Sequence, residues 1–77
     1  MKVEVLIFGQ LTDITGDPKI VIEDVRDTKQ FMERMHELYP ALNDATYIIA
    51  VNKNIISENT ILENNNIIAL LPPFSGG

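Results

Sequence analysis

The sequence predicts one small α+β domain with about five strands and one main helix. Five short segments are rich in β-branched residues or alternate between apolar and polar side chains. One segment has apolar residues at helical spacing, and the 77 residues suffice for a single core. No repeat, low-complexity stretch or internal linker indicates a second domain. We expect a folded unit over residues 1–71 and a flexible tail over residues 72–77.

The first two strands are predicted by alternation. Residues 2–8 place one apolar face at every second position, namely Val3, Val5 and Ile7. Residues 19–23 alternate in the same way. The intervening residues 9–18 are rich in Thr, Asp, Gly and Pro, which are typical of turns, so we expect a hairpin.

A single amphipathic helix follows. Asp27 stands three residues before Gln30, which is an Asp form of the capping box. Apolar residues then recur at helical spacing until Pro40, which should end the helix: Phe31, Met32, Met35, Leu38 and Tyr39. We expect this helix to cover one face of the sheet.

The second half of the chain predicts three more strands. Residues 47–52 form an unbroken β-prone run, as expected of a central strand buried on both faces. Lys53-Asn54 predicts a turn, because Asn tolerates positive φ, and Ile55-Ile56 begins a short return strand. Residues 57–66 are mostly polar, and residues 67–71 form the final strand.

The carboxyl end combines rigid and permissive residues. Pro72 and Pro73 lack backbone donors and should end pairing with the sheet. Gly76 and Gly77 have no Cβ, so they can thread a channel too narrow for other residues and leave the terminal carboxylate open to attack. Small residues are also common at frayed termini. The order of strand, prolines and glycines favours presentation of Gly77 to another protein.

Composition excludes several classes of function. The chain has 6 Lys+Arg against 11 Asp+Glu, and the net charge of −5 opposes binding to nucleic acid or an anionic membrane. A basic protein surface is the more natural partner. Without cysteine and with one histidine, the chain offers no disulfide framework and no zinc cluster. No signal peptide or long apolar run is visible, so we expect a cytoplasmic protein.

Three motifs carry a resemblance to a known family. They are Leu6-Ile7-Phe8-Gly9-Gln10-Leu11, Ile49-Ala50-Val51-Asn52, and the run from Ile68 through Leu71-Pro72-Pro73-Phe74-Ser75-Gly76-Gly77. Together with the order of elements, they resemble the sulfur carrier subunits of molybdopterin synthase, within the ubiquitin-like β-grasp proteins. This resemblance implies a mixed sheet with the helix on one face. The chain departs from the family at residues 63–66, Glu-Asn-Asn-Asn, where Asn can replace glycine in a left-handed position.

The chemistry of Gly77 needs a second enzyme. A carboxylate is a poor electrophile, so it must first become an acyl adenylate, at the expense of ATP with Mg²⁺. This chain has no phosphate-binding loop and would bind no cofactor or metal itself. We expect an E1-like adenylating enzyme to activate Gly77.

The resemblance implies the remaining steps. A persulfide donor system would convert the adenylate of Gly77 into a thiocarboxylate. The sulfur would then pass to a pyranopterin precursor in the large subunit, within a heterotetramer that has two copies of each subunit. The product would be the dithiolene of molybdopterin, and this chain would be a non-catalytic subunit whose tail, Ser75 and Gly76 included, threads into its partners.

Apolar residues predict a docking surface beside the tail. On a β-grasp fold, Phe8, Ile55 and Leu71 lie on the open face of the sheet, although Ile55 and Leu71 could instead belong to the core. By resemblance, the partner-binding set also includes Pro72, Pro73 and Phe74. His36 and Ser75 have no base or second ligand nearby in the sequence, and we assign neither a catalytic role.

Two other functions use the same Gly-Gly carboxylate. A ubiquitin-like modifier would join Gly77 to protein lysines, and a thiamine-type sulfur carrier would deliver sulfur to another pathway. Pro72-Pro73 and Ala50-Val51-Asn52 favour the molybdopterin branch. A plain interaction module without tail chemistry is the remaining alternative.

Overall fold

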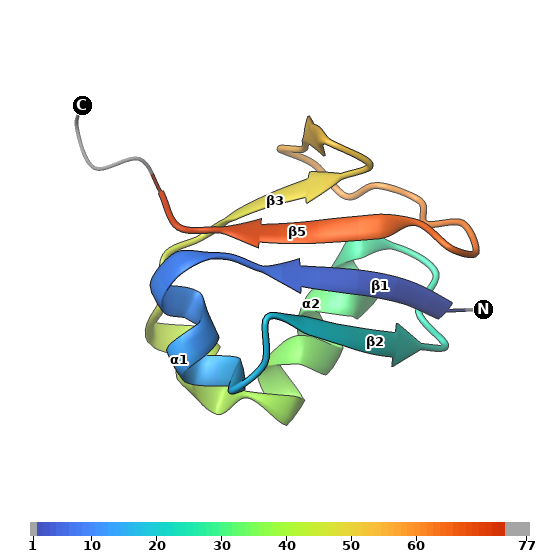
Figure 1. The fold of residues 1–77 in the computed structure, drawn as a ribbon. Helices are drawn as coiled ribbons and strands as arrows, with labels where there is room; N and C mark the ends of the chain where they lie inside the picture. The colour runs from blue at the N-terminus through green and yellow to red at the C-terminus, as the bar shows by residue number, and fades with distance from the viewer. Residues whose placement is uncertain (1, 74–77) are drawn as a thin grey trace.

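The computed structural model describes residues 2–73 and shows a mixed sheet covered on one side by a helix (Figure 1). Its strands are β1 (Lys2–Ile7), β2 (Lys19–Glu23), β3 (Ile48–Val51), β4 (Asn54–Ile55) and β5 (Ile67–Leu71). Its helices are η1 (Gly9–Leu11), α1 (Thr12–Thr15), α2 (Thr28–Leu38) and η2 (Pro40–Asp44), of which η1 and η2 are 3-10 helices. The predicted α+β class with one main helix is confirmed.

The sheet places the last strand in its middle. Among the described residues the strand order is β2-β1-β5-β3-β4. β1 pairs with β5 in parallel, whereas the β1–β2, β3–β5 and β3–β4 pairs are antiparallel. The first and final strands therefore run in the same direction, and their carboxyl ends lie at the same end of the sheet (Figure 1).

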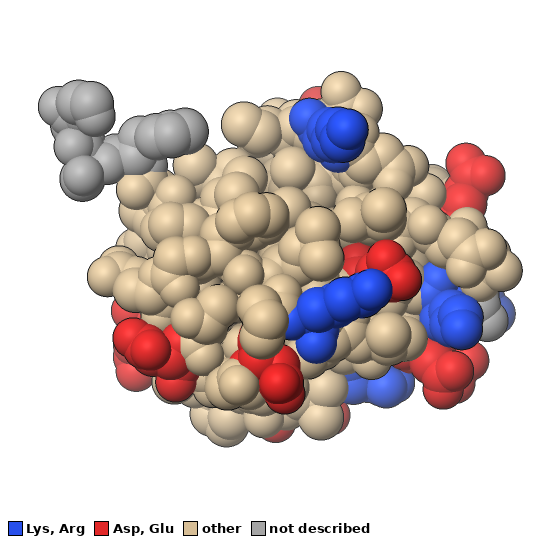
Figure 2. All heavy atoms as spheres, in the orientation of Figure 1, with Lys and Arg blue, Asp and Glu red and all other residues tan. Residues whose placement is uncertain are grey.

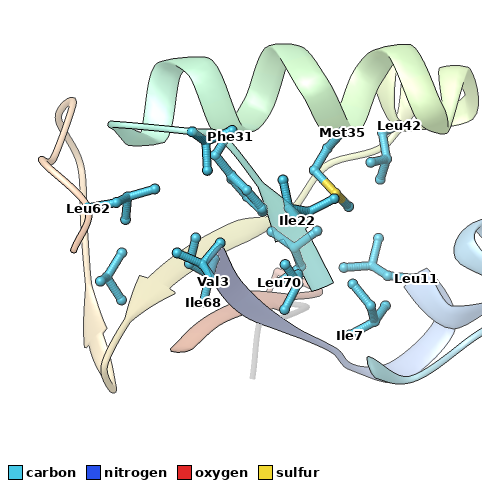
Figure 3. Close-up of a cluster of buried hydrophobic side chains, with 13 residues drawn as sticks. Val3, Ile7, Leu11, Ile22, Phe31, Met35, Leu42, Leu62, Ile68 and Leu70 are labelled. Carbon is cyan, nitrogen blue, oxygen red and sulfur yellow. The ribbon is translucent and has the colours of Figure 1, made fainter. Parts of the chain in front are cut away.

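The hydrophobic core lies between α2 and one face of the sheet (Figure 3). Alternate residues of β1 and β5 face it, since Val3, Val5, Ile68 and Leu70 are fully buried. Phe31 and Met35 of α2 pack on them with no exposed surface. The alternation read from the sequence thus identified the core face of β1.

The start of α2 is capped from two directions. The backbone N–H of Gln30 donates to Asp27 Oδ1 at 2.8 Å, and Gln30 Oε1 accepts from the N–H of Arg26 at 2.9 Å. The N–H of Lys29 donates to Asn59 Oδ1 at 2.8 Å. The predicted Asp27 cap is confirmed, although the Gln30 side chain accepts from the N–H of Arg26 rather than from that of Asp27. The polar loop before β5 adds a second cap, which ties that loop to the helix.

The segment predicted as a turn between β1 and β2 contains more structure than expected. Residues 9–15 form η1 and α1, and Leu11 and Thr15 are buried. One helical turn is too short to show a helical period, and its Thr and Asp side chains are also those of turns. Gly16, at φ +80°, ends α1, and the strands on either side pair as the expected hairpin.

β3 lies inside the sheet between β5 and β4, and none of its residues is exposed: Ile48 and Ile49 are partly buried, and Ala50 and Val51 are buried. The prediction for the turn that follows β3 was wrong. The turn is centred on Asn52-Lys53 rather than Lys53-Asn54, with φ values of 47° and 73°. Val51 therefore pairs with Asn54, and the return strand is Asn54–Ile55. The turn is shifted by one residue, and the Asn that adopts a positive φ is Asn52 rather than Asn54.

Leu38 does not join the core as the helical spacing predicted. It is 53% exposed, whereas Leu42 of η2 is buried at the same end of the core as Met35 (Figure 3). The chain turns after α2 and supplies Leu42 instead. Within residues 2–73, no helix is both long and apolar enough to cross a membrane.

Candidate docking face and tail root

The ends of β1 and β5 meet at one corner of the sheet. Ile7 pairs with Leu70, and the N–H of Phe8 donates to the carbonyl oxygen of Leu70 at 3.1 Å. Phe8 keeps an extended backbone, so its side chain continues the alternation of β1 and points away from α2. Leu71, one residue after Leu70, points to the same side.

An apolar surface extends from this corner across the face of the sheet opposite α2. The strand register places on this face Leu6 opposite Ala69, Ala69 opposite Ala50, Ile48 opposite Leu71, and Ala50 opposite Ile55. We call the set the open-face patch: Leu6, Phe8, Ile48, Ala50, Ile55, Ala69 and Leu71, of which Ala50 is buried by its neighbours. Phe8 is 43% exposed and Ile55 is 64% exposed, which makes them the large exposed anchors of the patch.

Most charged side chains on this face lie away from the tail root, although Lys19 lies opposite Leu6 of the patch. Lys19 and Glu4 form an ion pair at 3.4 Å with both side chains solvent-exposed, and Lys2 lies opposite Glu23 in the strand register at the far end of β1 and β2. Figure 2 shows an uncharged area over the ends of β1 and β5, whereas charged groups lie near the middle of the face, at its top, and toward the opposite end and the lower margin. This division into an apolar area and a charged rim is typical of protein interfaces.

The predicted partner-binding residues therefore divide into two groups. Phe8, Ile55 and Leu71 lie on the open face and outside the core cluster, which removes the alternative that Ile55 and Leu71 are core residues. Pro72 and Pro73, which we call the tail root, follow β5 directly; Pro72 is half-buried and Pro73 is exposed. The predictions for Phe74, Ser75, Gly76 and Gly77 lie outside the described residues.

Sequence reasoning missed four members of the patch and one residue of the corner. Leu6, Ile48, Ala50 and Ala69 occupy the strand positions that alternate with core residues, and an apolar residue at such a position is the signal that could have found them. Gly9 was noted as part of a motif but given no role. Its contact with the tail root is described below.

Polar side chains on the described surface are engaged in structural contacts. His36 lies within hydrogen-bond distance of Asn43 Oδ1 and of the Tyr47 hydroxyl, at 2.7 Å for the latter, and so connects α2, η2 and the start of β3. Burial raises the pKa of Tyr47. The described residues contain no group of His, Cys, Asp and Glu side chains that could hold a metal ion.

The helix cap also perturbs one carboxylate. The amide of Gln30, and then the side chain of Asn59, lower the pKa of Asp27 by donating hydrogen bonds to its ionised form. The lowered pKa of Asp27 is thus explained by its role as the N-cap of α2.

Two known proteins are similar to this chain over nearly their whole length. The chain is 28% identical over 82 residues to the molybdopterin synthase sulfur carrier subunit of Mycobacterium tuberculosis, which covers 100% of this chain and 99% of the relative. It is similar to a chain in the solved complex of subunits 1 and 2 of molybdopterin-converting factor from Helicobacter pylori, at 32% identity, a TM-score of 0.76 and full coverage of both chains.

The fold also occurs in a protein with a different name. Small archaeal modifier protein 1 of Methanosarcina acetivorans superimposes with a TM-score of 0.83 over 99% of this chain and 96% of that one, at 24% identity, which shows a shared fold. The sequence profile of the ThiS family matches residues 5–77. Because this match covers most of the chain, including all of β5 and the Gly76-Gly77 pair, the chain belongs to the ThiS family.

Proposed function

We propose that this chain is the sulfur carrier subunit of a molybdopterin synthase and that Gly77 carries the sulfur. Relatives of nearly the same length bear that name. The observation that carries the proposal is the position of the open-face patch, which begins at Phe8 and Leu71, directly beside the tail root. A partner that covers the patch would receive the tail at the edge of the same interface.

The energetics of the patch suit a reversible dock. Full burial of a large apolar side chain contributes about 1.5–3 kcal/mol, and Phe8 and Ile55 are already partly buried, so each contributes less. A carrier must bind one enzyme to be charged and another to be discharged, which requires release between them. Two exposed anchors with a charged rim meet this requirement better than a large hydrophobic interface.

The proposed chemistry takes place at the carboxylate of Gly77. An adenylating enzyme of the E1-like class joins this carboxylate to AMP and releases pyrophosphate. A persulfide sulfur then attacks the carbonyl carbon, AMP leaves, and a donor thiol cleaves the sulfur–sulfur bond to leave the thiocarboxylate. Donation of the sulfur to a pyranopterin precursor and hydrolysis regenerate the carboxylate, so the chain can be charged again.

The proposed partners follow from these steps. The large synthase subunit would cover the open-face patch in a heterotetramer with two copies of each subunit, and the subunit 1 and 2 complex from Helicobacter pylori supports such a pairing. The adenylating enzyme would use the same patch at a different time. In this proposal residues 1–71 are the docking body and residues 72–77 the tail, and the ATP requirement assigns the carrier to the cytoplasm.

The test is charging of the tail, followed by intact mass. Incubation with the cognate adenylating enzyme, Mg·ATP and a persulfide donor should add the mass that corresponds to replacing one carboxylate oxygen by sulfur. A variant with one residue added after Gly77 should remain folded and gain nothing, because the Gly77 carbonyl is then an amide. Gly76→Ala should slow charging by on the order of 10²-fold, since a misplaced reacting group costs that much.

Two results would contradict the proposal. Wild-type protein that never gains the sulfur mass, or an extended variant that is charged normally, removes Gly77 from the chemistry. If charging occurs but host extracts contain ladders of conjugates and the large subunit does not bind, the same carboxylate serves protein modification instead.

A further inference from the structure

Gly9 is held firmly at the corner where the tail leaves the sheet. It follows Phe8 at the end of β1, and its carbonyl oxygen accepts a hydrogen bond from Thr12 Oγ1 at 2.9 Å. The N–H of Leu11 donates to the carbonyl oxygen of Phe8, and the Leu11 side chain is buried in the core. The backbone at Gly9 is therefore fixed on both sides by contacts that do not involve the tail.

The ring of Pro72 packs directly on this glycine. A Cβ placed on Gly9 would lie 3.0 Å from Pro72 Cγ and 3.6 Å from Pro72 Cδ, although the two residues are far apart in sequence. Gly9 also has a φ of +58°, which favours glycine. A side chain at this position would crowd the proline ring, which would have to move to relieve the contact.

The hydrogen bonds of the sheet do not set the direction of the chain beyond Leu71. Leu71 is the last residue of β5 in register with β3, where it pairs with Ile48. Pro72 has no N–H to continue the ladder. The packing of its ring on Gly9 remains as a contact that orients the backbone after the sheet.

From this geometry we infer that Gly9 is a positioning residue for tail activation: its bare Cα seats the Pro72 ring and so sets the direction in which the tail leaves the open-face patch. The inference rests on the proposed carrier function. Because Gly9 follows the patch residue Phe8, and Pro72 follows the patch residue Leu71, the contact fixes the tail root relative to the docking surface. It does not contribute to docking itself.

The chain contains a matched control. Gly16 also has a positive φ, of +80°, but a Cβ there would meet no atom within 4 Å. Asn is the substitution of choice because it tolerates positive φ, as Asn52 and Asn65 do in this chain. Gly9→Asn and Gly16→Asn thus share the backbone cost, and only Gly9→Asn displaces Pro72.

The kinetic experiment compares charging of these variants by the adenylating enzyme and persulfide donor. For Gly9→Asn, kcat should fall on the order of 10-fold with KM for the carrier unchanged, because docking is intact and the tail is misdirected. Gly16→Asn should charge like the wild type, with a similar change in Tm. Equal kcat for the two variants, or a rise in KM without loss of kcat, would overturn the inference.

A second-site variant tests whether the proline ring is the cause. Pro72→Ala removes the ring atoms nearest Gly9, so Gly9→Asn should reduce kcat much less in a Pro72→Ala background than in the wild type. Full additivity of the two substitutions would show that Gly9 acts through some other contact, and the inference would be wrong.

An NMR experiment separates this inference from the carrier function. Gly9→Asn should shift the amide signals of residues 74–77, and Gly16→Asn should leave them unchanged. The absence of this selective shift would contradict the inference even if charging is normal. If the wild type is never charged, the carrier function fails, and the same comparison decides whether Gly9 orients the tail.

Discussion

Phe8→Ala is the most informative test of the open-face patch. Phe8 is 43% exposed. A phenylalanine side chain presents roughly 200 Å², so a partner that covers the exposed part removes roughly 85 Å² from water. At about 25 cal/mol per Å² this area corresponds to about 2 kcal/mol. We therefore expect the Kd for the large subunit to rise roughly 30-fold, since each 1.4 kcal/mol is about a tenfold change.

Val21→Ala is the matched control for this measurement. Val21 is 51% exposed and lies on the same face of the sheet, but it pairs with Glu4 at the charged end, away from the tail root. The Kd of the Val21→Ala variant for the large subunit should stay within about twofold of the wild-type value, as expected for a residue outside the interface. Isothermal titration calorimetry gives both values, and circular dichroism shows that both variants are folded. Similar Kd values for the two variants would refute a docking surface centred on Phe8.

Three further predictions concern stability. Asp27→Asn removes a carboxylate whose folded-state pKa is lowered, and such a group contributes stability above its unfolded pKa that is lost as the pH falls through the folded pKa. The variant should be less stable at neutral pH and lose less stability on acidification; parallel pH profiles from urea titrations would contradict this. Phe31→Ala should cost about 3–5 kcal/mol because the ring is fully buried, whereas the exposed Leu38→Ala should cost about 1 kcal/mol or less, and equal costs would show that the core is misassigned. The large subunit at about 100 times its Kd should stabilise the chain by about 2.7 kcal/mol. For a domain of this size that raises the Tm by roughly 10 °C or more, and an unchanged transition would argue against the dock.

The predictable part of the fold is local. Alternation in β1 and β2 identified which side chains enter the core, and the Asp27–Gln30 spacing located the start of α2. These signals arise within a few residues, because strand and helix periods are properties of the backbone. The turn at Asn52-Lys53 shows the limit, since a shift of one residue changes the pairing but hardly changes the local sequence preference.

The features that make the site depend on distant pairing. An apolar residue on the second face of a strand has the same sequence signal whether that face is covered by a helix or left open, which is why Leu6 and Ala69 were not assigned to the open-face patch from the sequence. The packing of Pro72 on Gly9 follows from the parallel pairing of β1 with β5, and nothing within either segment specifies it. Likewise, Leu42 replaces Leu38 in the core because of the path of the chain after α2.

The place of β5 between β1 and β3 has a consequence for synthesis of the protein. A nascent chain that has not yet reached residue 71 lacks the strand that joins the two halves of the sheet, so its native long-range pairing cannot be completed until residues 67–71 have been made. A chain truncated before Ile67 would lose this strand together with the tail. Loss of these residues would therefore remove both the complete sheet and the carboxylate that we propose is charged, so a truncated chain should not act as a carrier.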